Sequence, residues 1–167
     1  MRRGAAAAGT SLFLAAAPGT VAGLVPWLLT RWVAREPAPP LAVRVAGGLL
    51  ALAGGAVLLR SFVGFVVEGR GTPAPVAPTE RLVVGGPYRY VRNPMYVAIV
   101  ALVLGQALLL GRVVLLAYAL VTWAVPAAFV RWYEEPTLAA RYGAEYDAYR
   151  RAVPAWVPRA TPGWPPR

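Results

Sequence analysis

Long apolar runs separated by short turns dominate the chain. They cover residues 11–34, 41–67, 95–110 and 113–130. A helix that crosses the hydrocarbon core of a bilayer needs about 20 mainly apolar residues. The pattern therefore predicts an all-α integral membrane helical bundle with about four transmembrane helices, which we treat as a single membrane domain over residues 1–167.

Prolines and glycines within these runs predict local features. Pro18 and Pro26 lie in the first run, where membrane helices tolerate proline if neighbours satisfy the freed carbonyls, so we expect a kink there. Gly47-Gly48 and Gly54-Gly55 lie seven residues apart in the second run and place small residues on one helical face. Another helix can approach such a face closely, either within the chain or between chains.

The N-terminus has two interpretations. Arg2-Arg3, an apolar stretch and small residues near position 17 resemble a signal peptide. The apolar character continues to Val33 without a polar segment, however, which favours a retained helix.

The remaining segments are expected to be polar and cytoplasmic. Residues 68–94 are rich in proline and glycine and predict a loop. Residues 133–153 predict an amphipathic helix whose apolar stripe suits the membrane interface or a lid over a site; the stripe consists of Leu138, Tyr142, Tyr146, Tyr149 and Val153. The tail, residues 154–167, is expected to be irregular, with Trp156 as an interfacial anchor.

Composition and charge narrow the possible functions. Fully 58% of the residues are hydrophobic, and the net charge of +10 comes from arginine because lysine is absent. Histidine and cysteine are also absent, which excludes a thiol nucleophile, a disulfide and a thiolate or imidazole metal site, so we expect no metal. Because the arginines flank apolar runs, we expect anionic membrane lipids rather than nucleic acid as the partner.

The arginines also orient the chain. The positive-inside rule places both termini and the two polar segments in the cytoplasm, in an inner (cytoplasmic) membrane. Fewer arginines fall on the opposite side, namely Arg31, Arg35, Arg44 and Arg112.

Two polar motifs are joined by the hairpin of the third and fourth runs. Residues 86–96 read GPYRYVRNPMY, and Glu134-Glu135 follow the second helix of the hairpin. A hairpin returns to the face at which it started, so the motifs should meet. Ionisable groups beside lipid are costly, which makes this meeting point a candidate site.

In these motifs the chain resembles a known family, the isoprenylcysteine carboxyl methyltransferases and related phospholipid methyltransferases. The resemblance lies in Arg92-Asn93-Pro94-Met95-Tyr96, the hairpin, Glu134-Glu135, and the following Leu138, Tyr142-Gly143, Tyr146 and Tyr149, and covers roughly residues 69–159. It implies an S-adenosylmethionine-dependent membrane methyltransferase. The methyl acceptor would be hydrophobic or lipidated and would enter from the bilayer, and carboxyl O-methylation is favoured.

One position departs from the family pattern. Asn93 stands where the family commonly has histidine. An asparagine amide forms neutral hydrogen bonds but does not titrate near neutral pH. A role in proton transfer is therefore in doubt at this position, whereas a role in holding the cofactor remains.

Methyl transfer from a sulfonium requires positioning more than acid–base chemistry, in agreement with a chain that lacks histidine, cysteine and lysine. Glu134 or Glu135 would hold the amino group of the cofactor, and Arg89 or Arg92 its carboxylate. The adenosine would lie among tyrosines of the Pro94-containing motif, namely Tyr88, Tyr90 and Tyr96.

The family also associates an arginine just before the Glu pair with catalysis. Arg131 is the candidate, and its spacing of four residues from Glu135 places the two on one face of a helix. We expect this pair to orient substrate or cofactor.

Structural interpretations compete with these roles. The arginines would be topological anchors, the tyrosines an interfacial aromatic belt, and Arg131 a simple counter-ion for the Glu pair. The corresponding alternative function is a non-catalytic membrane scaffold or lipid-binding protein. A transporter is disfavoured, because the charges gather at one face and not at the bilayer midplane.

Overall fold

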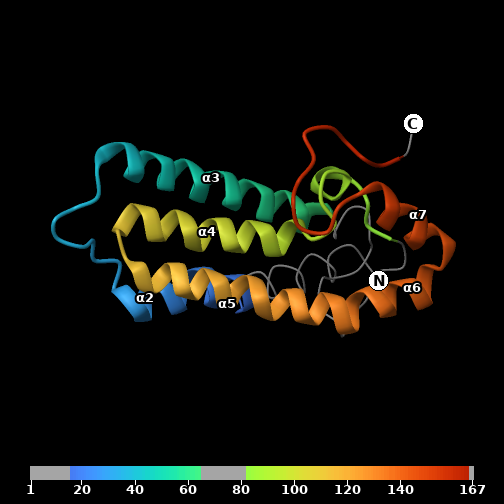
Figure 1. The fold of residues 1–167 in the computed structure, drawn as a ribbon, viewed down its shortest axis with the longest axis horizontal. Helices are drawn as coiled ribbons and strands as arrows, with labels where there is room; N and C mark the ends of the chain where they lie inside the picture. The colour runs from blue at the N-terminus through green and yellow to red at the C-terminus, as the bar shows by residue number, and fades with distance from the viewer. Residues whose placement is uncertain (1–15, 65–81, 166–167) are drawn as a thin grey trace.

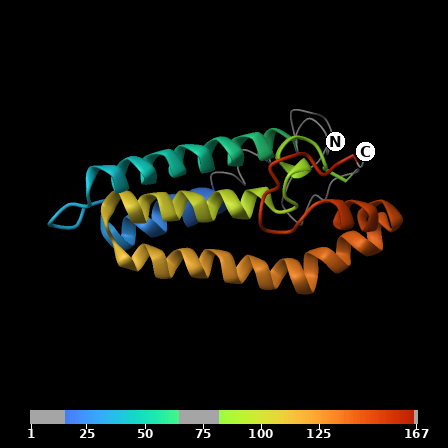
Figure 2. The same ribbon diagram turned by 45° about the horizontal axis from the view of Figure 1, so that its top comes forward.

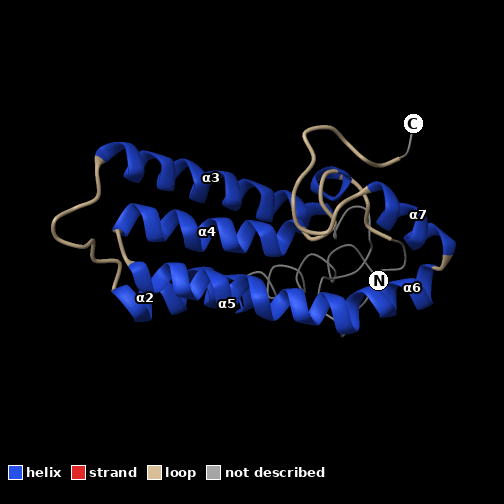
Figure 3. Ribbon diagram, in the orientation of Figure 1, coloured by secondary structure: helices blue, strands red, loops and turns tan. Residues whose placement is uncertain are grey.

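A computed structural model describes residues 16–64 and 82–165, and these residues form helices and loops with no β-strand (Figures 1 and 3). The predictions for Arg2-Arg3, the signal peptide and residues 68–81 of the loop lie outside the described residues. The elements in chain order are the π-helical turn η1 (Thr20–Leu24), α2 (Val25–Thr30), α3 (Leu41–Gly64), the 3₁₀ turn η3 (Gly86–Arg89), α4 (Pro94–Leu110), α5 (Val113–Phe129), the π-helical turn η4 (Val130–Glu134), α6 (Glu135–Tyr142) and α7 (Ala144–Ala152).

Two helices of the described ranges are long and apolar enough to span a membrane. They are Leu41–Gly64 and the continuous helix Val113–Tyr142, and only 17% and 22% of their most apolar stretches are buried within the chain. Side chains such as Leu52 (74% exposed) and Leu120 (62% exposed) point outward. The core helix of a soluble protein would be covered by other parts of the chain, so these surfaces are suited to lipid.

The other two predicted spans are shorter apolar helices, Ala16–Thr30 and Pro94–Leu110. Of the four predicted spans, two are therefore helices long enough to cross a membrane, and the other two are shorter. Helix α4 begins at Pro94 and ends at Leu110, and Gly111, with a φ of +65°, caps it. Its 17 residues are about 26 Å long at ~1.5 Å per residue, slightly less than the ~30 Å hydrocarbon core.

Close backbone contact holds α3 against α4, and Figures 1 and 2 show the two helices side by side. A Cβ added to Gly47 would lie 2.7 Å from the Gly105 carbonyl oxygen, and one added to Gly54 would lie 2.8 Å from that of Ala98. A Cβ added to Gly105 would likewise lie 2.7 Å from the Gly47 carbonyl oxygen. The glycine face predicted for the second run therefore packs within the chain.

The proline in the first helix is accommodated by its neighbours, as expected. Pro26 has no N–H, so the Ala22 carbonyl lacks its usual helical donor, and the Val25 N–H donates to the Thr20 oxygen in place of the Val21 oxygen. Gln106 of α4 donates its side-chain amide to the Ala22 oxygen at 2.8 Å, and the Tyr118 hydroxyl of α5 donates to the Val21 oxygen at 2.9 Å. The chain forms the π-helical turn η1 at this point.

The C-terminal part differs from the single amphipathic helix predicted over residues 133–153. Gly143 adopts a positive φ of 51° and separates α6 from α7. Tyr146, Tyr149 and Val153 are buried together rather than presented to a membrane interface. Leucine, tyrosine and tryptophan side chains pack around them, among them Leu82, Leu138, Tyr142 and Trp164. The stripe therefore forms a small core with the loop and the tail, and residues 154–165 are irregular, as predicted.

Candidate functional site

The two polar motifs meet at one end of the bundle, where η3, the start of α4, and α6–α7 gather (Figures 1 and 2). The Nη1 atom of Arg92 and the Oε1 atom of Glu135 lie 2.8 Å apart. The side chains of this ion pair are only 12% and 14% exposed. The hairpin thus brings its two ends together, which confirms the expected meeting of the motifs.

Arg92 has a second hydrogen-bond partner, and it also has one buried nitrogen atom that lacks a partner. Its Nη1 also donates to the Tyr146 hydroxyl at 3.2 Å. Burial raises the pKa of Tyr146, while the positive charge of Arg92 lowers it. The Nε atom of Arg92 is buried and has no hydrogen-bond acceptor among the residues that the structure describes. A buried donor without an acceptor is costly, so the guanidinium is prepared to bind one more acceptor atom.

The second carboxylate of the pair faces an aromatic group. The Tyr96 hydroxyl donates to the Oε2 atom of Glu134 at 3.4 Å. The Tyr96 ring lies 6.3 Å from the ring of Trp156, which in turn lies 6.3 Å from the ring of Trp123 on α5. An acidic group beside aromatic faces is an arrangement that favours a cation.

The π-helical turn η4 positions the Glu pair. It ends at Glu134, two residues before Pro136, just as η1 ends two residues before Pro26. Pro136 removes one N–H from the helical ladder, and the wider turn of η4 replaces the regular helix at that point. Such turns within helices are frequent at functional sites.

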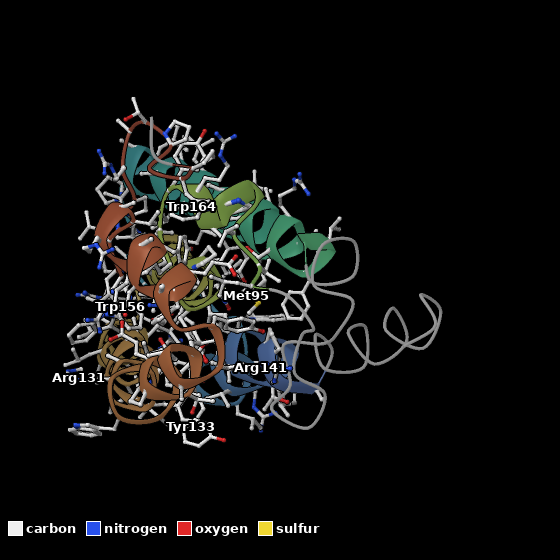
Figure 4. The ribbon with its side chains drawn as sticks, turned by 90° about the vertical axis from the view of Figure 1, so that its right-hand side faces the viewer. Met95, Arg131, Tyr133, Arg141, Trp156 and Trp164 are labelled. Carbon is white, nitrogen blue, oxygen red and sulfur yellow. The ribbon has the colours of Figure 1, made fainter. Side chains whose placement is uncertain are left out.

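This turn also changes the expected position of Arg131. In a π-helical turn the hydrogen bonds run from i to i+5, so residues four apart no longer lie above one another. Arg131 is exposed and forms no ion pair with Glu135, whose partner is Arg92. In Figure 4 Arg131 lies at the periphery of the molecule, whereas Met95 lies near its middle.

The other residues predicted for the site are held mainly by the tail and by α7. The Asn93 side-chain amide donates to the Ala155 carbonyl oxygen at 3.0 Å, and Arg89 Nε donates to that of Trp164 at 2.7 Å. The Tyr88 carbonyl accepts the Tyr149 hydroxyl at 2.7 Å. Of the remaining two, Pro94 is fully buried as the first residue of α4, and Tyr90 is 36% exposed.

Backbone hydrogen bonds attach the tail to residues 89–92 of the loop that carries the first polar motif before α4 (residues 86–93, the motif loop). The Arg92 N–H donates to the Pro154 oxygen (2.8 Å), the Arg159 N–H to that of Tyr90 (3.0 Å), and the Gly163 N–H to that of Arg89 (2.7 Å). We refer to residues 154–164 as the C-terminal strap. Sequence reasoning missed this strap because backbone partners leave no mark on side-chain patterns.

Comparison with known proteins identifies the family to which the chain belongs. The phospholipid methyltransferase family model matches residues 43–145, which is more than half of the chain. The chain therefore belongs to the phospholipid methyltransferase family, whose members are membrane methyltransferases.

A particular relative is the protein-S-isoprenylcysteine O-methyltransferase of Schizosaccharomyces pombe. It is 38% identical over 78 residues, which cover 46% of this chain and 33% of the relative. The match thus spans about a third of the length of that protein. No solved structure matches the chain.

Proposed function

We propose that the protein transfers a methyl group from S-adenosylmethionine to a hydrophobic or lipidated acceptor, with carboxyl O-methylation favoured. The observation that carries this proposal is the largely shielded Arg92–Glu135 ion pair with its unsatisfied Nε donor, placed beside the Tyr96–Glu134 pair at one end of an apolar hairpin. Family membership supplies the class of reaction.

The residues at this end fit the cofactor. Arg92 would bind its carboxylate, because the buried Nε lacks an acceptor, whereas Arg89 is already bonded to the strap. Glu134 or Glu135 would bind its amino group, and Tyr96 would contact the adenosine or the sulfonium.

When bound, the cofactor would supply an electrophilic methyl group. An acceptor carboxylate oxygen would form the new O–C bond as the S–C bond breaks, with the electron pair left on sulfur and no proton released. An anion and a cation thereby become a neutral ester and a thioether. Charge is lost on the way to the transition state, so a site shielded from water favours the reaction. The task of the chain is to hold the two reactants in line, which agrees with a sequence that lacks histidine, cysteine and lysine.

The acceptor also needs a cationic contact. Arg131 remains our candidate for orienting the acceptor, since it is exposed at the same end of the bundle and forms no ion pair within the described part of the chain. Asn93 is assigned a positioning role through Ala155 in place of proton transfer.

Placement in the membrane follows from the apolar surfaces. We propose that α4 and the helix Ala16–Thr30 cross the bilayer with α3 and α5, in the cytoplasmic membrane, with both termini and the site on the cytoplasmic side. Membrane lipids would then cover the outward leucines and valines of α3 and α5.

The named relative provides an acceptor to test. Wild-type protein in lipid nanodiscs would receive labelled S-adenosylmethionine and N-acetyl-S-farnesylcysteine, and base-labile methyl ester would be counted. We expect ester formation that Glu135→Gln reduces at least about tenfold. Glu145→Gln, which changes an exposed carboxylate on α7, is the matched control and should leave the rate unchanged. Binding of S-adenosylmethionine without any ester would exclude this acceptor, and the absence of binding would favour the membrane scaffold instead.

A further inference from the structure

Three aromatic rings connect the site to the lipid-facing surface. Tyr96 begins this aromatic row, and its hydroxyl is bonded to Glu134. Trp156 of the C-terminal strap follows at 6.3 Å with its ring tilted by 35°, and Trp123 of α5 follows at another 6.3 Å, edge to face at 72°. Trp123 is 44% exposed among the apolar side chains of α5. The row therefore runs from the partly buried Glu134 carboxylate to the exposed apolar surface of α5.

Trp156 is held in this row by the strap and is not a loose anchor. The two residues before it, Pro154 and Ala155, accept hydrogen bonds from the Arg92 N–H and the Asn93 side chain. On its other side, Arg159 is bonded to the Tyr90 carbonyl. The motif loop, which carries the ion pair, thus also fixes the position of the Trp156 ring.

An acceptor of the proposed kind has two dissimilar ends. Its reacting group must reach the carboxylate end of the site, while its hydrocarbon chain must remain in apolar surroundings. The aromatic row offers this gradient, because an indole buries a large apolar area with little loss of conformational entropy.

We propose that Trp156 is a specificity-determining residue that contacts the hydrocarbon chain of the methyl acceptor, with Trp123 continuing the contact toward lipid and Asn93 positioning Trp156 through Ala155. This inference rests on the proposed function, because it assigns the chain-binding part of the same site.

The test compares Trp156→Ala with Trp132→Ala in full-length protein in nanodiscs. Trp132 is a matched control at the same end of the bundle, since it is 79% exposed and makes no ring contact in the described residues. The probes are N-acetylcysteines bearing S-farnesyl or the shorter S-geranyl chain. For Trp156→Ala we expect the KM for the farnesyl probe to rise about tenfold, with kcat and the affinity for S-adenosylmethionine changed by less than about twofold. The preference for farnesyl over geranyl should also shrink, whereas Trp132→Ala should resemble wild type.

Equal KM values for the two variants would overturn the assignment, as would a loss of cofactor binding equal to the loss of acceptor binding. If Trp156→Ala does not fold, Trp156→Phe, which keeps a smaller ring, replaces it. Its KM for the farnesyl probe should rise by less than about tenfold, whereas Trp132→Phe should resemble wild type. If wild-type protein binds S-adenosylmethionine but methylates neither probe, the proposed acceptor is wrong, and direct binding of tritiated farnesyl probe then decides. Weaker binding of this probe by Trp156→Ala than by Trp132→Ala would support contact between Trp156 and the hydrocarbon chain. Equal binding by the two variants, or no binding by wild type, would reject it.

Discussion

Arg92 and Glu135 come from opposite ends of the α4–α5 hairpin and form an ion pair of 2.8 Å with little exposure to solvent. The pair joins the motif loop to the first residue of α6, and through Tyr146 it also reaches α7. One guanidinium therefore couples the motif loop to two helices, α6 and α7, that are distant from it in sequence.

The first prediction concerns this coupling. A buried charge that loses its partner is strongly destabilising, whereas removal of both charges costs much less. Arg92→Gln and Glu135→Gln should each lower the thermal unfolding midpoint of the detergent-purified protein. The double variant should be no less stable than either single variant. Additive losses in this double-mutant cycle would show that the two side chains act independently.

A second prediction concerns the strap. Asn93→Asp keeps the shape of the side chain but replaces the donor to the Ala155 oxygen by an acceptor, which should detach the strap. Limited trypsin digestion should then cut after the exposed Arg159 at least about fivefold faster than in wild type, because about 1 kcal/mol of holding energy is lost. Asn93→His retains an N–H donor and should restore resistance to trypsin. If trypsin cuts Asn93→Asp and Asn93→His at the same rate, the hydrogen bond from residue 93 does not hold the strap.

The α3–α4 contact gives a third prediction with adjacent positions as its control. A Cβ at Gly54 would lie 2.8 Å from a backbone oxygen, whereas one at Gly55 would lie 4.0 Å from the flexible end of Leu102. Gly54→Ala should therefore cost about 1–3 kcal/mol of stability, while Gly55→Ala should cost nothing measurable. Thermal unfolding in detergent measures both, and equal midpoints would contradict the close packing of these helices.

The fourth prediction tests the accommodation of Pro26. Gln106→Leu leaves the Ala22 carbonyl without its side-chain donor and should destabilise the protein by about 1–2 kcal/mol. Pro26→Ala supplies a backbone N–H to that carbonyl, so Gln106→Leu should cost much less in this background. A cost that is the same in both backgrounds would show that Gln106 acts in some other way.

Much of this architecture was predictable because it follows from one-dimensional pattern. The apolar runs predicted the bounds of α3, α4 and α5 closely. The return of the hairpin to its starting face predicted that Arg92 and the Glu pair would meet. The glycines of α3 marked a close helix contact, although the sequence left open whether the partner helix belonged to the same chain.

The features that were not predicted depend on backbone geometry. The pairing of Arg131 with Glu135 assumed a regular helix, and the π-helical turn before Pro136 removed that register. The tyrosine stripe was assigned to an interface or a lid, yet it packs with Trp164 of the strap and with Leu82, which lies far away in sequence. The place of Trp156 depends on backbone carbonyls of the strap, which any residue type provides.

The most direct test of the central claim is the binding of S-adenosylmethionine to wild-type protein in nanodiscs, compared with Glu135→Gln and with Glu145→Gln as control. We predict saturable binding by wild type and by the control, weakened at least about tenfold, or roughly 1.4 kcal/mol, in Glu135→Gln. Absence of saturable binding by folded wild-type protein, or equal affinity in all three proteins, would contradict the assignment of the Arg92–Glu135 end as the cofactor site.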